Sequence, residues 1–168
     1  MEKEKLLFDF GCGTNLSKCK SSRKAGPVGF LLTGVSTFLI LTIENKVGFV
    51  KTGISDWWNN LLIVLTTTEL LIVLVWSTFS AAPKTRGEMF SKSGIYSIIR
   101  HPIYTVIIFH LPIVVALFYK SFVLLFFIPA NYIFWSRLVR GEEEYLVGIF
   151  GEDYVDYMAK IPRFVPWR

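Results

Sequence analysis

The stretch 93–104 contains a dense group of side chains that are able to do chemistry. Arg100 and His101 are adjacent, Tyr96 and Tyr104 lie on either side of them, and a long apolar run follows. Such a cluster suits a ligand site at the mouth of a hydrophobic segment. It also suits simple anchoring, because Arg and Tyr favour the membrane interface in any membrane protein. Both interpretations stay open on these residues alone.

Pro102 predicts that a helix begins at this point. Proline lacks an N–H, which matters little in the first turn of a helix, where such groups are unpaired anyway. The residue before a proline is pushed out of helical geometry, so His101 belongs to the connection before the helix. We therefore expect Arg100 and His101 at the start of a helix, at the edge of the bilayer.

A second group of polar residues follows Arg137, where the composition changes from apolar to charged. Apolar and aromatic residues at three- and four-residue intervals, from Tyr145 to Tyr157, predict short amphipathic helices on the membrane surface. In the simplest interpretation, the acidic run Glu142-Glu143-Glu144 belongs to the solvent-exposed face of a helix in the cytoplasmic tail. Acidic side chains are repelled by an anionic membrane surface, however. We therefore expect at least one of these glutamates to be buried or to face a ligand.

Two motifs in fixed order connect these groups. The first comprises Gly94-x-Tyr96 followed by Arg100-His101-Pro102-x-Tyr104. The second comprises Glu142-Glu143-x-x-Leu146-x-x-x-Phe150-Gly151-x-x-Tyr154-x-x-Tyr157 and Pro162. This pattern resembles that of the isoprenylcysteine carboxyl methyltransferases and the related phospholipid N-methyltransferases, and it covers roughly 88–166. The chain departs from the family at Val106, where a glycine is common. The departure concerns helix packing or cofactor approach and leaves the polar residues untouched.

The resemblance implies that S-adenosylmethionine is the cofactor, held on the cytoplasmic side beneath the C-terminal helices, while a lipid or prenylated substrate enters from the bilayer. It implies cofactor contacts by Glu88, Met89, Phe90, Ser91, Tyr96, Arg100, His101, Pro102, Ile103, Tyr104, Glu142 and Glu143. It associates an arginine shortly before the acidic pair with the substrate, so Arg137 is the first candidate and Arg140 the second. The expected catalytic residues are Arg137 and Glu142.

In such enzymes the protein has to align donor and acceptor and exclude water, which supplies several kcal/mol by positioning. The glutamates would bind the cofactor's amino group or ribose hydroxyls, and Arg100 or His101 its carboxylate. A prenylcysteine carboxylate, the favoured acceptor, needs no base, and Arg137 would orient it. A phospholipid amine would need a base, either a glutamate or His101. The sequence also leaves open a membrane sterol-type reductase that uses NADPH and an inactive structural membrane protein.

The elements that position these residues follow from the composition. A chain of 168 residues with 52% hydrophobic and 16% aromatic residues and a mean hydropathy of +0.48 is an integral membrane domain. We expect an all-α, polytopic helical bundle. The basic residues flank apolar runs and form no basic stripe, so the sequence argues against nucleic-acid binding. The four expected spans are Gly26 to Ile43, Leu61 to Ala82, Ile103 to Tyr119 and Ser121 to Ser136, the last two joined by a tight hairpin at Lys120.

Lys and Arg predict the orientation. Fifteen of them lie before the first span, between the second and third spans and after the fourth, whereas three lie in the other two connections. By the positive-inside rule both termini and the candidate site residues face the cytoplasm. The expected organisation is a basic tail (1–25), a transmembrane domain (26–136) that includes the cofactor-binding connection 83–102, and C-terminal helices (137–168) that complete the pocket.

Two polar residues fall inside the spans. A carboxyl group within a bilayer is costly, so we expect Glu69 to point into the bundle and to have a partner there. A structural role is the expectation for Glu69 and for His110. Cys12 and Cys19 match no zinc or redox spacing, and we expect no metal.

Overall fold

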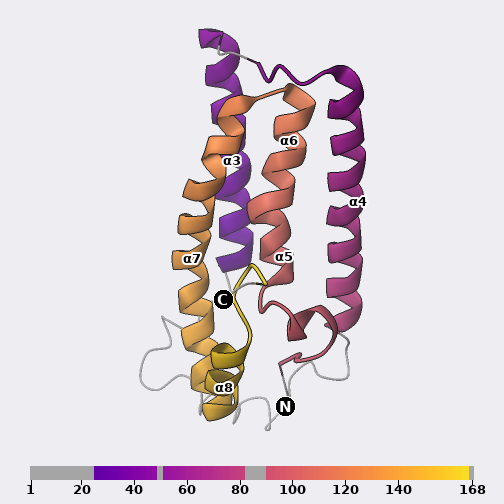
Figure 1. Ribbon diagram of the computed structural model, residues 1–168. Coiled ribbons are helices and arrows are strands. Elements are labelled where there is room, and N and C mark those ends of the chain that lie inside the picture. The colour runs from indigo at the N-terminus through magenta and orange to yellow at the C-terminus, as the bar shows by residue number, and fades with distance from the viewer. Residues whose placement is uncertain (1–24, 49–50, 82–89, 167–168) are drawn as a thin grey trace.

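The computed structural model describes residues 25–48, 51–81 and 90–166. These residues form helices, four of which are long and apolar enough to cross a membrane (Figure 1). The expected all-α, polytopic class is therefore confirmed. The elements in order are α3 (Ala25–Val47), α4 (Asp56–Ser80), η2 (Gly94–Ser97), α5 (Pro102–Thr105), η3 (Val106–His110), α6 (Leu111–Tyr119), α7 (Phe122–Phe150) and α8 (Glu152–Lys160).

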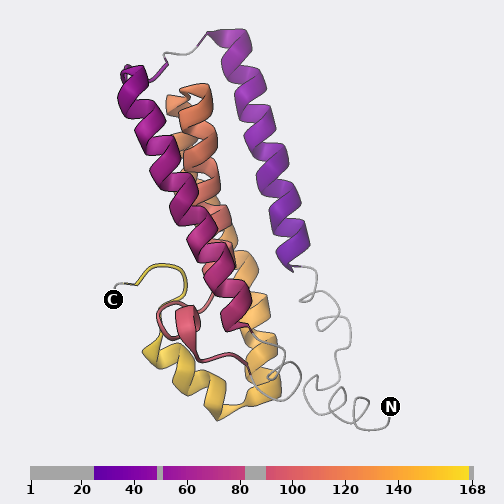
Figure 2. The ribbon, with the colours of Figure 1, turned by 90° about the vertical axis from the view of Figure 1, so that its right-hand side faces the viewer.

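The four spans are α3, α4, the continuous unit α5–η3–α6, and α7, and they run alternately up and down (Figures 1 and 2). The hairpin between α6 and α7 is as tight as expected. Lys120 adopts a left-handed conformation with φ of 50°, and Ser121 caps α7 by accepting a hydrogen bond from the Leu124 N–H at 3.2 Å. Because the spans alternate, the start of α5 and the ends of α4 and α7 lie at the same end of the bundle.

Pro112 lies within the third span without ending it. Proline cannot donate the backbone hydrogen bond that a regular helix requires from it, and its ring crowds the preceding turn. The wider π-helical turn η3 precedes the proline and relieves this conflict. Asn131 of α7 donates its side-chain amide to the carbonyls of Ile107 at 3.4 Å and Ile108 at 3.2 Å. The span therefore continues to Tyr119 with its freed carbonyl groups satisfied from a neighbouring helix.

The first span packs closely on α7. A Cβ atom at Gly29 would lie 2.5 Å from the Trp135 ring, so only glycine permits this approach. The indole N–H of Trp135 donates to the Thr33 hydroxyl at 3.0 Å. Small residues of this kind let transmembrane helices approach each other, and buried hydrogen bonds stabilise the contact. Trp135 also belongs to the buried core, which includes Val139 and Phe164.

The fourth span is longer than the sequence predicted. The apolar run ends at Ser136, but α7 continues as one helix to Phe150, so the expected boundary between 136 and 137 falls inside a helix. The physical reason is a buried face that continues past the apolar run, with Val139 and Glu143 following Trp135 at four-residue intervals. Gly151, with φ of 58°, ends the helix, because glycine adopts a positive φ without steric cost.

Candidate active site

Two groups of residues about forty positions apart in the sequence meet at one end of the bundle. The start of α5, the end of α7, α8 and the segment 161–166 gather at the lower end in Figure 1. A cavity of about 220 Å³ lies here, lined by residues 90–91, η2, the start of α5, the end of α7 and α8. Nine of its twelve lining residues are among those that the sequence predicted to contact a cofactor. The lining residues are Phe90, Ser91, Tyr96, Arg100, His101, Pro102, Ile103, Tyr104, Glu142, Leu146, Tyr154 and Tyr157.

The C-terminal segment 161–166 holds the start of α5 in place. The backbone N–H of Arg100 donates to the carbonyl of Pro162 at 2.9 Å, and that of His101 donates to the carbonyl of Arg163 at 3.1 Å. The Thr105 hydroxyl donates to the carbonyl of Phe164 at 2.9 Å. The two residues before Pro102 thus have their backbone donors satisfied by a segment about sixty residues away in the sequence. This pairing gives the proline turn one fixed geometry.

Glu143 is the charged centre of this end of the bundle. Its residue is only 4% exposed. One carboxylate oxygen lies 2.8 Å from Arg100 Nη1 and 3.3 Å from His101 Nε2. The same oxygen accepts a hydrogen bond from Arg163 Nε at 3.1 Å, while the second oxygen pairs with Arg163 Nη2. Glu143 does not line the cavity, although the sequence predicted a cofactor contact for it. It joins α7, the start of α5 and the C-terminal segment.

Glu142 faces the cavity instead. Consecutive residues of an α-helix point about 100° apart, so neighbouring glutamates serve different surroundings. The Tyr104 hydroxyl donates to Glu142 Oε2 at 2.9 Å. Burial, and secondarily the negative charge of Glu142, raise the pKa of Tyr96. The cavity therefore has one carboxylate on its wall, with two tyrosines near it.

Arg100 has hydrogen-bonding capacity that its neighbours leave unused. Its side chain is 10% exposed, and it lines the cavity. Its Nη1 atom lies 2.8 Å from Glu143 Oε1 in an ion pair, whereas its Nε atom is buried without a hydrogen-bond partner within the described residues. Buried donors without acceptors are costly. A guanidinium in this state suits a ligand with a carboxylate or another planar anion.

An aromatic wall closes the side of the cavity toward α8. The ring of Phe90 meets those of Tyr154 and Tyr157 at centroid distances of 4.8 and 5.0 Å. The Tyr157 hydroxyl donates to the carbonyl of Tyr96 at 2.6 Å. Burial is the main cause that raises the pKa of Tyr154 and that of Tyr157, the latter to about 12. Both phenols are therefore neutral at physiological pH, and the wall suits a flat, uncharged ring.

Three lining residues, Leu146, Tyr154 and Tyr157, were absent from the predicted set. All three belong to the second motif, at spacings of eight and three residues. The signal that identifies the two tyrosines is the apolar face of α8, of which they are the buried residues; Leu146 lies near the end of α7. In sequence alone this face is the same as that of any helix lying on a membrane surface.

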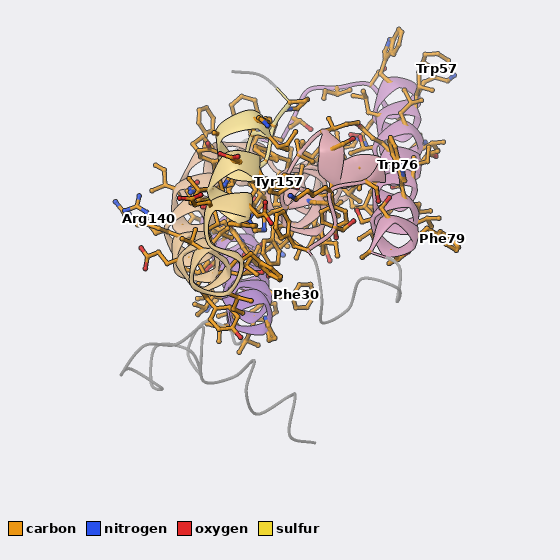
Figure 3. The ribbon with its side chains drawn as sticks, turned by 90° about the horizontal axis from the view of Figure 1, so that it is seen from below. Phe30, Trp57, Trp76, Phe79, Arg140 and Tyr157 are labelled. Atoms are coloured by element: carbon orange, nitrogen blue, oxygen red, sulfur yellow. The ribbon has the colours of Figure 1, made fainter. Side chains whose placement is uncertain are left out.

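The remaining predicted residues are Glu88, Met89, Arg137 and Arg140. Glu88 and Met89 fall outside the described residues. Arg137 is exposed on α7 and does not line the cavity. Arg140 is also exposed, and Figure 3 shows it projecting outward, away from Tyr157. Among the described residues no group of three His, Cys, Asp or Glu side chains could hold a metal ion.

Sequence comparisons relate this chain to known proteins. Residues 61–148 match the model of the isoprenylcysteine carboxyl methyltransferase (ICMT) family. A protein-S-isoprenylcysteine O-methyltransferase of Schizosaccharomyces pombe is 32% identical over 87 residues, which are 51% of this chain and 36% of that protein. The enzyme of the same name from Saccharomyces cerevisiae is 30% identical over 112 residues, 58% of this chain and 47% of that protein. The chain thus spans less than half the length of these curated relatives.

No solved structure matches the chain at a significant level. The family assignment therefore depends on sequence. The matched region covers more than half of the chain and includes the Arg100-His101-Pro102 turn and the Glu142-Glu143 pair. The chain belongs to the isoprenylcysteine carboxyl methyltransferase family.

Proposed function

We propose that this protein is an S-adenosylmethionine-dependent methyltransferase that acts on a lipid-embedded acceptor, with the carboxylate of a prenylated cysteine as the favoured substrate. The single observation that carries the proposal is the meeting of the two motifs in one cavity at one end of the bundle, with Arg100 and Glu142 on its wall. Family membership and the activity for which both relatives are named support the choice of reaction.

The residues present fit such a cofactor. Its amino-acid end carries a carboxylate and an amino group, and the guanidinium of Arg100 and the carboxylate of Glu142, both on the cavity wall, match these two charges. Its adenine is a flat ring, which suits the wall of Phe90, Tyr154 and Tyr157. When bound, the cofactor supplies an electrophilic methyl group on a positively charged sulfur. The chain's own residues then need only to bind, orient and exclude water.

Each residue has a distinct part in that task. Glu143 and the segment 161–166 fix the proline turn, so Arg100 and Tyr104 keep their positions on the wall. The hydrogen bond from Tyr104 orients the Glu142 carboxylate. A carboxylate acceptor is already a nucleophile at neutral pH and needs no base. An amine acceptor would have to lose a proton, and Glu142 is the lining carboxylate that would take it.

We also propose that the cavity faces the cytoplasm. Arg100 lies just before α5, Lys160 ends α8 and Arg163 follows it, and Figure 1 shows these elements at the lower end of the bundle. Lys46 in the last turn of α3, Lys51, and Lys120 at the end of α6 lie in the connections at the other end. The sequence places most Lys and Arg residues in the termini and in the connection between the second and third spans. By the positive-inside rule, this distribution supports a cytoplasmic location of the cavity.

The decisive test uses the purified full chain. We expect S-adenosylhomocysteine to bind and NADPH not to bind in a calorimetric titration. With methyl-labelled S-adenosylmethionine, we expect the label in an N-acetyl-S-prenylcysteine carboxyl ester, which is labile to base. Label in phospholipid amines, which is stable to base, would select the amine acceptor instead. Binding of NADPH alone would reject methyl transfer, and binding of neither compound would reject the cofactor site.

A further inference from the structure

Two groups of polar side chains in the bundle have no part in the proposed reaction. The first is in the middle of α4. The expectation that Glu69 points into the bundle is wrong, because its side chain is 66% exposed, although it does have a partner in His110 Nε2 at 3.5 Å. The second group lies at the other end of the bundle from the active-site cavity. Figure 1 shows the connection 51–55 and the α6–α7 hairpin together at this upper end.

A cavity of about 530 Å³, which we call the hairpin cavity, lies between this connection and the start of α7. The backbone N–H of Thr52 donates to the carbonyl of Lys120 at 2.9 Å, which fixes the connection on the hairpin. Its polar groups are therefore held in place before any ligand binds. The lining residues are Lys51, Thr52, Gly53, Ile54, Phe122 and Leu125.

The ammonium group of Lys51 has donors left for a ligand. An ammonium carries three N–H donors, and within the described part of the chain Lys51 Nζ uses one of them, for the carbonyl of Tyr119 at 3.3 Å. The Glu44 carboxylate lies 3.8 Å from Nζ, which is too far for a hydrogen bond. The Glu44 side chain is 1% exposed, whereas that of Lys51 is 50% exposed. Asp56, at the start of α4, pairs with Lys120 instead. Lys51 is thus the accessible charge of the cavity wall.

Thr52 supplies a second donor beside this cation. Its hydroxyl is buried and has no hydrogen-bond partner among the residues that the structure describes. A buried polar group without a partner is costly, so a ligand that accepts a hydrogen bond from Thr52 would stabilise the protein. The wall formed by α7 is apolar, with Phe122 50% exposed and Leu125 on the same helix. The cavity therefore suits a molecule that has an anionic head and an apolar chain.

The depth of the hairpin cavity agrees with such a molecule. Trp57 and Trp58 lie in the first turn of α4, directly after the connection that lines the cavity, and both are exposed. Tryptophan prefers the level of the lipid head groups. The Lys51 ammonium is therefore at the level where the phosphate groups of membrane lipids lie.

We propose that the hairpin cavity binds a phospholipid of the leaflet opposite to the active-site cavity. The phosphate accepts hydrogen bonds from the Lys51 ammonium and the Thr52 hydroxyl, and the first of these is charge-assisted. One acyl chain lies on Phe122 and Leu125. This site is at the far end of the bundle from Arg100 and Glu142, so it exists whether or not the proposed methyl transfer is correct.

Titration of the full chain in detergent with dioleoylphosphatidylglycerol, followed by native mass spectrometry, tests this proposal. We expect one lipid to bind in preference to others, and dioleoylglycerol, which lacks the phosphate, to bind at least tenfold more weakly. Lys51→Gln should raise the dissociation constant for the phospholipid at least tenfold. The matched control is Lys46→Gln, which removes an exposed lysine in the last turn of α3 outside the cavity lining and should leave this constant unchanged. No methyl donor is present, so the result is independent of the proposed reaction.

A second variant avoids the loss of charge beside Glu44. Thr52→Val keeps the shape of the side chain and removes a hydroxyl that has no partner within the described residues. It should melt no lower than the wild type and bind the phospholipid at least threefold more weakly. Equal affinity for the two lipids, an equal loss in Lys46→Gln and Lys51→Gln, or unchanged affinity in Thr52→Val would overturn the proposal. Displacement of the lipid by millimolar inorganic phosphate would also overturn it, since the site would then bind the free anion.

Discussion

Removing the Glu143 carboxylate should destabilise the protein, whereas removing that of Glu142 should weaken ligand binding. Glu143 is 4% exposed and neutralises Arg100, whose side chain is 10% exposed, and Arg163. Breaking a buried ion pair from one side costs about 3–5 kcal/mol, because it leaves the other charge without compensation. For a chain of this size each kcal/mol lowers the melting temperature by roughly 2–4 °C, so Glu143→Ala should lower it by roughly 6–20 °C.

Thermal unfolding followed by tryptophan fluorescence in detergent measures this loss. Glu144→Ala is the matched control, because this exposed glutamate neighbours Glu143 on α7 and should change stability by no more than about 0.5 kcal/mol. Glu142→Ala should melt like the wild type without ligand and bind S-adenosylhomocysteine at least tenfold more weakly. If Glu143→Ala melts like Glu144→Ala and loses only ligand affinity, Glu143 is a cofactor ligand, and the reasoning from burial fails.

Further predictions concern the cavity wall, one turn and one phenol. Arg100→Gln should weaken S-adenosylhomocysteine binding at least tenfold in calorimetry, while Arg137→Gln should not, since only Arg100 lines the cavity; the reverse order would support the substrate role that the sequence predicted for Arg137. Gly94→Ala should lower the melting temperature, because φ is +59° and the new Cβ atom would lie 2.1 Å from Ser80 Oγ. An unfolded tyrosine titrates at about pH 10, and burial raises the pKa of Tyr157 in the folded chain to about 12. Between these two pH values the folded state holds a proton that the unfolded state has lost. Stability should fall with rising pH in this window, and a Tyr157→Phe slope equal to that of the wild type in chemical unfolding would contradict this.

The sequence by itself determined the number and class of the spans and the membership of the two motifs. Apolar length and flanking charge are local properties, so four spans follow from counting residues. Pro102 marks the start of α5 because its ring restricts its own backbone and that of His101. The residues of the two motifs could be identified from their types and their order along the chain, without any knowledge of the distances between them in space.

Only the tertiary structure decided which of the predicted site residues line the cavity and which hold the surrounding segments together. Glu142 and Glu143 are adjacent residues of the same type. The rotation of α7 about its axis places Glu142 on the cavity wall and Glu143 among Arg100, His101 and Arg163. That rotation is set by packing of the buried face of α7 against other helices. The pairing of 161–166 with the start of α5, the exposure of Arg137 and the outward position of Glu69 likewise depend on contacts between segments far apart in the chain. A pattern along one segment carries no information about which surface another segment will cover.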